Sequence, residues 1–197
     1  MTSRPDTPFY FIFLGGLFAV TFIGLGSRHK GETQVRITPD SFLLALTFVG
    51  MGAVPLFYIF TSRLNPFTYR LPLWAGYIGT FLLAGSIVLL WRAHADLGQN
   101  WSITPRILAD QKFVTNGVYH YMRHPIYASY WLWAFAQPLL LHNWVAGFSM
   151  LATFAPLYLY RVPREEEMMI GAFGEEYIRY MHQTPAILPL KRKPVRT

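Results

Sequence analysis

Four long stretches of this sequence contain no Asp, Glu, Lys or Arg, and they constrain its fold more than any other feature. They cover residues 7–27, 41–62, 71–91 and 124–160, and each of the first three contains 21 or 22 residues. A helix needs about 20 apolar residues to cross the roughly 30 Å hydrocarbon core of a membrane. Each of these three stretches therefore predicts one membrane-spanning helix.

The fourth stretch has 37 residues, which is too long for one span. At its centre, residues 141–143 read Leu-His-Asn and favour a turn, so we interpret the stretch as a helical hairpin. The prediction is an all-α integral membrane protein with five transmembrane helices in one membrane domain of 197 residues. The predicted spans cover residues 8–26, 41–61, 72–91, 125–141 and 144–160.

The composition agrees with this class. Hydrophobic residues make up 53% of the chain and charged residues only 14%, against about a quarter charged residues in a typical soluble domain. The chain has no cysteine, which excludes a secreted scaffold held together by disulfides.

Basic residues are distributed unequally between the two faces of the predicted membrane domain. Segments 28–40, 92–124 and 161–197 would share one face, and they hold 14 of the 17 Lys and Arg residues. Because such residues accumulate on the cytoplasmic side, we expect the N-terminus outside and the C-terminus in the cytoplasm. The net charge of +7 then indicates topology and contact with anionic membrane lipid, and we expect no nucleic-acid partner.

The polar side chains concentrate in the two larger cytoplasmic segments, 92–124 and 161–197. These segments hold seven of the ten acidic residues and four of the six histidines. No predicted span contains an Asp, Glu, Lys or Arg, whereas transport sites usually place such residues within the membrane. The sequence therefore predicts chemistry at the cytoplasmic mouth of the bundle, with a channel or scaffold as the non-enzymatic alternative.

A bend is predicted at the entrance of the fourth span, where the sequence reads Arg123-His124-Pro125. Pro125 disfavours helical dihedral angles at His124 and suits the first turn of the following helix. The bend would place an imidazole and backbone N–H groups at the lipid–water boundary, where they suit a polar or anionic ligand. An interfacial anchor is an equally simple role for Arg123 and His124. The sequence has no HExxH, GxGxxG or P-loop motif, and we expect no metal site.

After the fifth span the sequence reads Arg161-Val-Pro163-Arg-Glu165-Glu166-Glu167. We expect a new helix there, with Pro163 in its first turn and acidic residues near its N-terminus. A helical wheel places Glu166 in the middle of an apolar face, which is costly for an unpaired carboxylate. The apolar members of this face are Met169, Ile170, Phe173, Tyr177, Tyr180 and Met181. Arg161 can pair with Glu165 only if the helix continues through Pro163.

These residues form a set of motifs in a fixed order. They are Leu97-Gly98 with Trp101, Val114-Thr115-x-Gly117-x-Tyr119, Arg123-His124-Pro125-x-Tyr127, Arg161-x-x-x-Glu165-Glu166 and Phe173-Gly174-x-x-Tyr177 with Tyr180. The set resembles the isoprenylcysteine carboxyl methyltransferase and phospholipid methyltransferase superfamily, in particular its prokaryotic integral membrane members of the isoprenylcysteine type. The resemblance covers about residues 90–190, and it is specific because the Arg-His-Pro-x-Tyr turn and the Glu-Glu helix occur together.

The resemblance implies S-adenosylmethionine as the cofactor and S-adenosylhomocysteine as the product, bound by segments 92–124 and 161–197. The cofactor contacts that it implies are Leu97, Gly98, Gln99, Val114, Tyr119, His124, Pro125, Tyr127 and Glu165. It implies Arg161 as the arginine of the substrate site, and an amine acceptor would need Glu165 or Glu166 as its general base. Gln111 stands where relatives often have His, and this departs from the family pattern.

The implied acceptor is a lipophilic or prenylated molecule that reaches the enzyme through the lipid of the cell (inner) membrane. An isoprenylcysteine-like carboxylate is the first expectation, because it needs no general base and Arg161 could orient it. Two alternatives stay open, namely N-methylation of a phospholipid headgroup and reduction by a membrane NADPH-dependent reductase of similar fold.

Overall fold

The computed structural model describes residues 7–26, 39–98 and 114–188, and it confirms an all-helical fold in these ranges. A single isolated β-bridge, between Thr68 and Asn143, is the exception to helix and turn in the described part of the chain. In chain order the helices are α1 (Thr7–Gly26), α2 (Pro39–Phe48), the π-helix η1 (Val49–Ala53), α3 (Val54–Phe60), the 3₁₀ helix η2 (Asn65–Phe67), α4 (Leu73–Leu97), the 3₁₀ helix η4 (Gly117–His120), α5 (Pro125–Leu141), α6 (Trp144–Phe173) and α7 (Glu175–Gln183).

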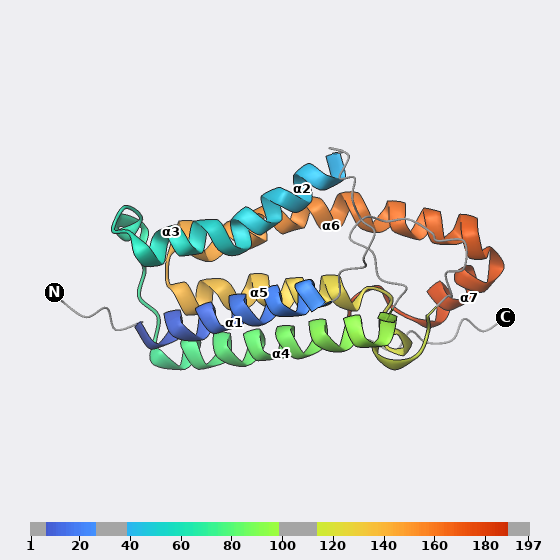
Figure 1. The fold of residues 1–197 in the computed structure, drawn as a ribbon, viewed down its shortest axis with the longest axis horizontal. Helices are drawn as coiled ribbons and strands as arrows, with labels where there is room; N and C mark the ends of the chain where they lie inside the picture. Colours follow the sequence, from blue (N-terminus) through green and yellow to red (C-terminus); the bar gives the residue numbers. More distant parts are fainter. Residues whose placement is uncertain (1–6, 27–38, 99–113, 189–197) are drawn as a thin grey trace.

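The long helices form an elongated bundle in which α5 lies between α4 and α6 (Figure 1). Helix α1 packs against α4 and α5, while α2, η1 and α3 together cover α6. Within the described residues, three helical stretches are long and apolar enough to cross a membrane, and α1 contributes a shorter apolar helix. The three stretches are Ser41–Phe60, Leu73–Leu97 and Trp144–Phe173. The predicted count of five spans stays a prediction.

The second predicted span contains a π-helical segment that ends two residues before Pro55. Val54 donates its backbone N–H to Val49 instead of to Gly50, and Pro55 has no N–H to donate. The Gly50 carbonyl accepts hydrogen bonds from Gln137 Nε2 at 3.1 Å and Ser149 Oγ at 2.6 Å. A backbone group that the helix leaves free is therefore satisfied by α5 and α6, as the interior of a membrane bundle requires.

The turn predicted at residues 141–143 is confirmed between α5 and α6. His142 adopts the left-handed conformation with φ 49° and ends α5. Asn143 caps α6, because its Oδ1 accepts hydrogen bonds from the backbone N–H groups of Val145 at 3.0 Å and Ala146 at 2.9 Å. This turn makes α5 and α6 an antiparallel pair, so residues 125–130 face the region that follows Tyr160.

Two expectations for the segment after the fifth span are wrong. No new helix begins at Pro163, because α6 continues through Pro156 and Pro163 to Phe173. The chain then reverses at Gly174, where φ is 55°, so the helical wheel cannot be continued to residue 181. Figure 1 shows the consequence: α6 extends past the end of α5, and α7 folds back towards the turn that precedes α5.

Candidate functional site

The predicted polar residues gather at one end of the bundle, where four parts of the chain meet. These parts are the end of α4, the residues from 114 to the start of α5, the last third of α6, and α7 with the residues after it (Figure 1). Helix α4 ends at Leu97, and Gly98 follows with a φ of 53°. Residues that are up to 90 positions apart in the sequence are thereby brought to one place.

Asp96 fixes the loop that leads into the site. Its Oδ2 accepts the backbone N–H of Val118 at 2.8 Å, and its Oδ1 pairs with Arg92 at 3.0 Å. Gly117 has a φ of 59°, and a Cβ built on it would lie 2.1 Å from Asp96 Oδ2. Only glycine allows both this conformation and this close approach. The contact orients η4 so that Tyr119 is buried at the edge of the site.

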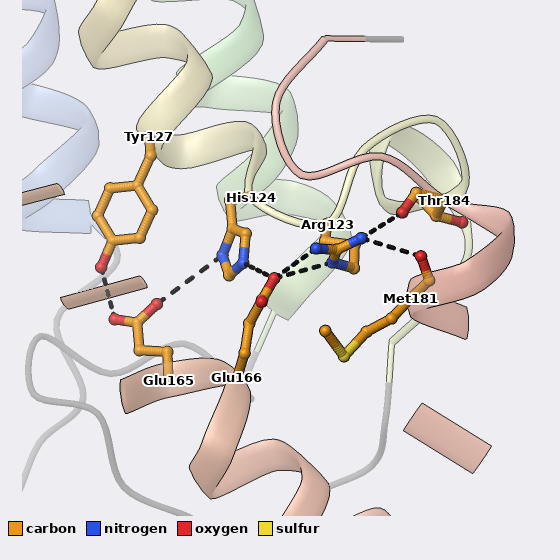
Figure 2. Close-up of polar contacts among 7 residues, drawn as sticks. All are labelled: Arg123, His124, Tyr127, Glu165, Glu166, Met181 and Thr184. Atoms are coloured by element: carbon orange, nitrogen blue, oxygen red, sulfur yellow. Dashed lines mark hydrogen bonds and ion pairs between the residues drawn. The ribbon is translucent and has the colours of Figure 1, made fainter. Parts of the chain in front are cut away.

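Arg123 and Glu166 form the centre of the first polar cluster (Figure 2). The carboxylate oxygen Oε1 of Glu166 accepts hydrogen bonds from Arg123 Nε at 2.9 Å and Arg123 Nη2 at 2.6 Å. The same oxygen lies 3.0 Å from Nε2 of His124, which donates the third hydrogen bond. Arg123 Nη1 donates to the carbonyl oxygens of Met181 at 3.1 Å and Thr184 at 2.5 Å. These bonds join the turn, α6 and the end of α7.

Glu165 is the centre of a second cluster on the neighbouring side. Its Oε1 accepts the hydroxyl of Tyr127 at 2.5 Å and lies 3.1 Å from Nε of Arg161. The pair between Arg161 and Glu165 exists because α6 continues through Pro163, the condition that the sequence left open. Oε2 of Glu165 lies 3.9 Å from Nδ1 of His124, so the imidazole stands between the two carboxylates (Figure 2).

Aromatic residues of α7 close the far side of the site. Tyr177 and Tyr180 are the buried residues of this helix, and the hydroxyl of Tyr180 donates to the carbonyl of Tyr119. Burial raises the pKa of the Tyr119, Tyr177 and Tyr180 hydroxyls above its usual value near 10. All three hydroxyls therefore remain protonated and neutral at neutral pH.

The structure brings together most of the residues that the sequence assigned to a site. His124, Tyr127, Arg161, Glu165 and Glu166 are linked by hydrogen bonds and ion pairs through Glu165 and His124. Glu166 points inward, as expected, and so does Glu165. Tyr119 lies at the edge of this group, and Pro125 begins α5. Leu97 ends α4 and Gly98 follows it, Val114 is the first described residue after residue 98, and Gln99 lies outside the described residues.

Three residues with structural roles at the site were not predicted as site residues. Arg123 was placed on the bend but not assigned to the site, although its position beside His124 was the available signal. Asp96 could have been found from its spacing of four from Arg92 on a helix. Nothing in the sequence pairs Tyr180 with Tyr119. Among the described residues, no group of three or more His, Asp and Glu could hold a metal ion.

The arrangement offers carboxylates, donors and aromatic rings but no thiol, since the chain lacks cysteine. Carboxylates beside aromatic rings suit a cationic ligand, and a buried guanidinium suits a carboxylate. The model of the isoprenylcysteine carboxyl methyltransferase (ICMT) family matches residues 77–171. This range contains the bend before α5 and the residues of α5 and α6 that form the two polar clusters. The chain is an ICMT-like protein.

The relatives of this ICMT-like protein are enzymes of that name. Protein-S-isoprenylcysteine O-methyltransferase of Schizosaccharomyces pombe is 30% identical over 100 residues, which cover 50% of this chain and 42% of that protein. The chain thus spans less than half the length of this relative. A probable protein-S-isoprenylcysteine O-methyltransferase of Oryza sativa subsp. indica is 26% identical over 180 residues, which cover 90% of this chain and 91% of that protein.

A solved structure shares the fold of the ICMT-like chain. The eukaryotic intramembrane Ras methyltransferase ICMT superimposes with a TM-score of 0.63 at 20% sequence identity, over 97% of this chain and 70% of that chain. This similarity confirms an ICMT-like membrane fold. It agrees with the helical architecture that the distribution of charges in the sequence predicts.

Proposed function

We propose that this chain transfers a methyl group from S-adenosylmethionine to the carboxylate of a lipophilic, isoprenylcysteine-like acceptor. The observation that carries the proposal is the gathering of two carboxylates, a histidine, a tyrosine and an arginine at one end of a bundle of apolar helices. The names of the relatives from S. pombe and O. sativa support the same reaction.

The residues at this end fit a cofactor that carries an ammonium group, a sulfonium and an adenosine. The Glu165 side chain is 20% exposed, so its carboxylate can meet a cationic group without being fully desolvated. The rings of Tyr127 and His124 lie with their centroids 5.7 Å apart and supply an aromatic surface that suits an adenine. When bound, S-adenosylmethionine would supply an electrophilic methyl group.

The chain's own residues would hold the acceptor and exclude water. Arg161 is only 6% exposed, and its guanidinium pairs with Glu165, so it can also orient an acceptor carboxylate in a poorly hydrated site. A carboxylate is already nucleophilic, and no residue has to remove a proton from it. We therefore assign the rate acceleration mainly to positioning and to the exclusion of water.

We also propose that the site lies on the cytoplasmic side of a five-span bundle, with the acceptor entering from the bilayer. Helices α1 and α5 pack within the same bundle as the longer helices, which supports spans for both. Because the chain has no cysteine, single cysteines at the exposed positions Ser62 and Glu176 can report the topology. An impermeant thiol reagent should label S62C in intact cells and E176C only after permeabilisation, and the reverse pattern would contradict the orientation.

Ligand titration separates the proposed function from its alternatives. Purified protein in detergent should bind S-adenosylhomocysteine, and NADPH should give no saturable signal in isothermal titration calorimetry. Binding of NADPH alone would favour the reductase. Methylation of phosphatidylethanolamine vesicles but not of a prenylated cysteine would favour the phospholipid N-methyltransferase.

A further inference from the structure

Arg123 connects three parts of the chain that are distant in sequence. Its side chain is only 6% exposed, and its guanidinium makes two hydrogen bonds to Glu166 on α6 and one each to the carbonyls of Met181 and Thr184. Figure 2 shows these bonds converging on one planar group. A guanidinium suits this role because it presents five donors in a fixed planar arrangement, which an ammonium group cannot do.

The backbone at Arg123 strengthens the same connection. The N–H of Arg123 donates to the carbonyl of Pro185 and the N–H of His124 donates to the carbonyl of Ala186, both at 2.9 Å. The residues after α7 are thus attached to the bend by two main-chain bonds as well as by the guanidinium. Helix α7 buries only Tyr177 and Tyr180, so its apolar contact is small and the polar contacts carry much of its attachment.

The two adjacent carboxylates have different surroundings. One oxygen of Glu166 receives three hydrogen bonds, two from Arg123 and one from His124, and all three donors belong to the bend. Glu165 instead contacts Tyr127 and Arg161, to which we assign the cofactor and the acceptor, and it lies 3.9 Å from the other nitrogen of His124. The charge of Glu166 is therefore neutralised within the frame of the site, and that of Glu165 lies on the ligand side.

We propose that Arg123 and Glu166 form a latch that holds α7 and residues 184–186 against the bend, and that Arg123 is a positioning residue for the cofactor. Glu165 is then the carboxylate that meets the ligand. The part of the proposal that concerns the ligand rests on the proposed methyltransferase function. The part that concerns the latch is a statement about the chain and can be tested without any ligand.

Hydrogen–deuterium exchange on the full chain in detergent tests the latch. We expect Arg123→Ala to increase exchange at residues 175–188 by at least about tenfold, because it leaves the Glu166 carboxylate and two carbonyls without their donor. We expect Glu166→Gln to increase it in the same direction, because it removes the negative charge that faces the buried Arg123 guanidinium. The matched control is Arg179→Ala, since Arg179 is exposed and its Nε donates to the carbonyl of Glu175 on its own helix, at 3.4 Å. Unchanged exchange at residues 175–188 in Arg123→Ala would overturn the latch.

Kinetic constants test the positioning role. Arg123→Ala should raise the KM for S-adenosylmethionine by at least about tenfold and leave the KM for the acceptor within about twofold, because the proposed acceptor residue, Arg161, is held by Glu165 on its own helix. Arg123→Lys should restore part of the loss, since one ammonium can pair with Glu166 but cannot also reach both carbonyls. Equal rises in both KM values, or no effect of Arg123→Ala on the cofactor KM, would overturn it. If the wild-type protein binds no S-adenosylhomocysteine, the proposed function fails while the exchange experiment still decides the latch.

Discussion

Replacing Glu165 by Gln removes one negative charge at the point where the ligand is proposed to bind and changes the shape of the side chain little. The amide oxygen of Gln can still accept the hydroxyl of Tyr127, which bonds Glu165 at 2.5 Å. The ion pair with Arg161, now 3.1 Å long, is lost, as is the charge available to a ligand ammonium group. A hydrogen bond to a charged group contributes about 1.5–3 kcal/mol, and this corresponds to a rise of roughly 10- to 150-fold in Kd.

Isothermal titration of S-adenosylhomocysteine into Glu165→Gln and wild-type protein measures this difference directly. Glu167→Gln is the matched control, because Glu167 is two positions further along α6 and exposed. We expect the control to bind S-adenosylhomocysteine as tightly as the wild type. The Kd of Glu165→Gln should be roughly 10- to 150-fold higher than that of the wild type. If Glu165→Gln bound the ligand as tightly as the wild type while Glu166→Gln lost binding without loosening α7, our division of roles between the two carboxylates would be wrong.

Two further predictions concern the bundle that supports the site. Gln137→Leu leaves the buried indole N–H of Trp133 without the Gln137 Oε1 acceptor that it now contacts at 3.1 Å, and should lower the free energy of unfolding by about 1–3 kcal/mol in SDS titrations from mixed micelles. A Cβ at Gly50 would lie 2.6 Å from the carbonyl oxygen of Ser149, so Gly50→Ala should cost about 1–3 kcal/mol in the same assay. Gly15→Ala is its control, since a Cβ there meets nothing within 4 Å. Equal stability of the two alanine variants would contradict the close packing of α6 on η1.

The helical segments were predictable because a single physical requirement decides them. A membrane helix must exclude charge over about 20 residues, and this leaves a pattern that is visible without any structure. The turn at His142 and Asn143 was predictable for a related reason, since polar residues interrupt an apolar stretch only where the chain leaves the membrane interior or caps a helix. The π-helix at residues 49–53 was not, because it depends on hydrogen-bond donors supplied by Gln137 and Ser149 from other helices.

The course of α6 shows where local rules are insufficient. Proline within a helix removes one hydrogen bond and is disfavoured by about 3 kcal/mol, so a helix start at Pro163 was the simpler expectation. Continuing the helix instead allows Arg161 to pair with Glu165 and allows Arg164 to donate to the carbonyl of Tyr160 at 3.1 Å. Glu166 reaches Arg123 from the same helix. These contacts are long-range or depend on the continuation itself, so no reading of residues 161–167 alone could weigh them.

The site was half predictable for the same reason. The residue types and their order in the motifs identified His124, Tyr127, Arg161, Glu165 and Glu166, and the structure places them in contact. The reversal at Gly174, which brings the end of α7 to the bend, depends on a backbone conformation with φ 55° that the sequence permits but does not require.

Transfer of a radiolabelled methyl group is the measurement that tests the central claim most directly. Membranes containing the protein would be incubated with S-adenosylmethionine labelled in its methyl group and with an S-farnesylated N-acetylcysteine, and the extracted product would be treated with base. The account predicts label in the lipophilic product that base releases as methanol, the behaviour of a carboxyl methyl ester, and a marked loss of that label with Glu165→Gln. Absence of base-releasable label from this acceptor, whether or not phosphatidylethanolamine is labelled, would contradict it.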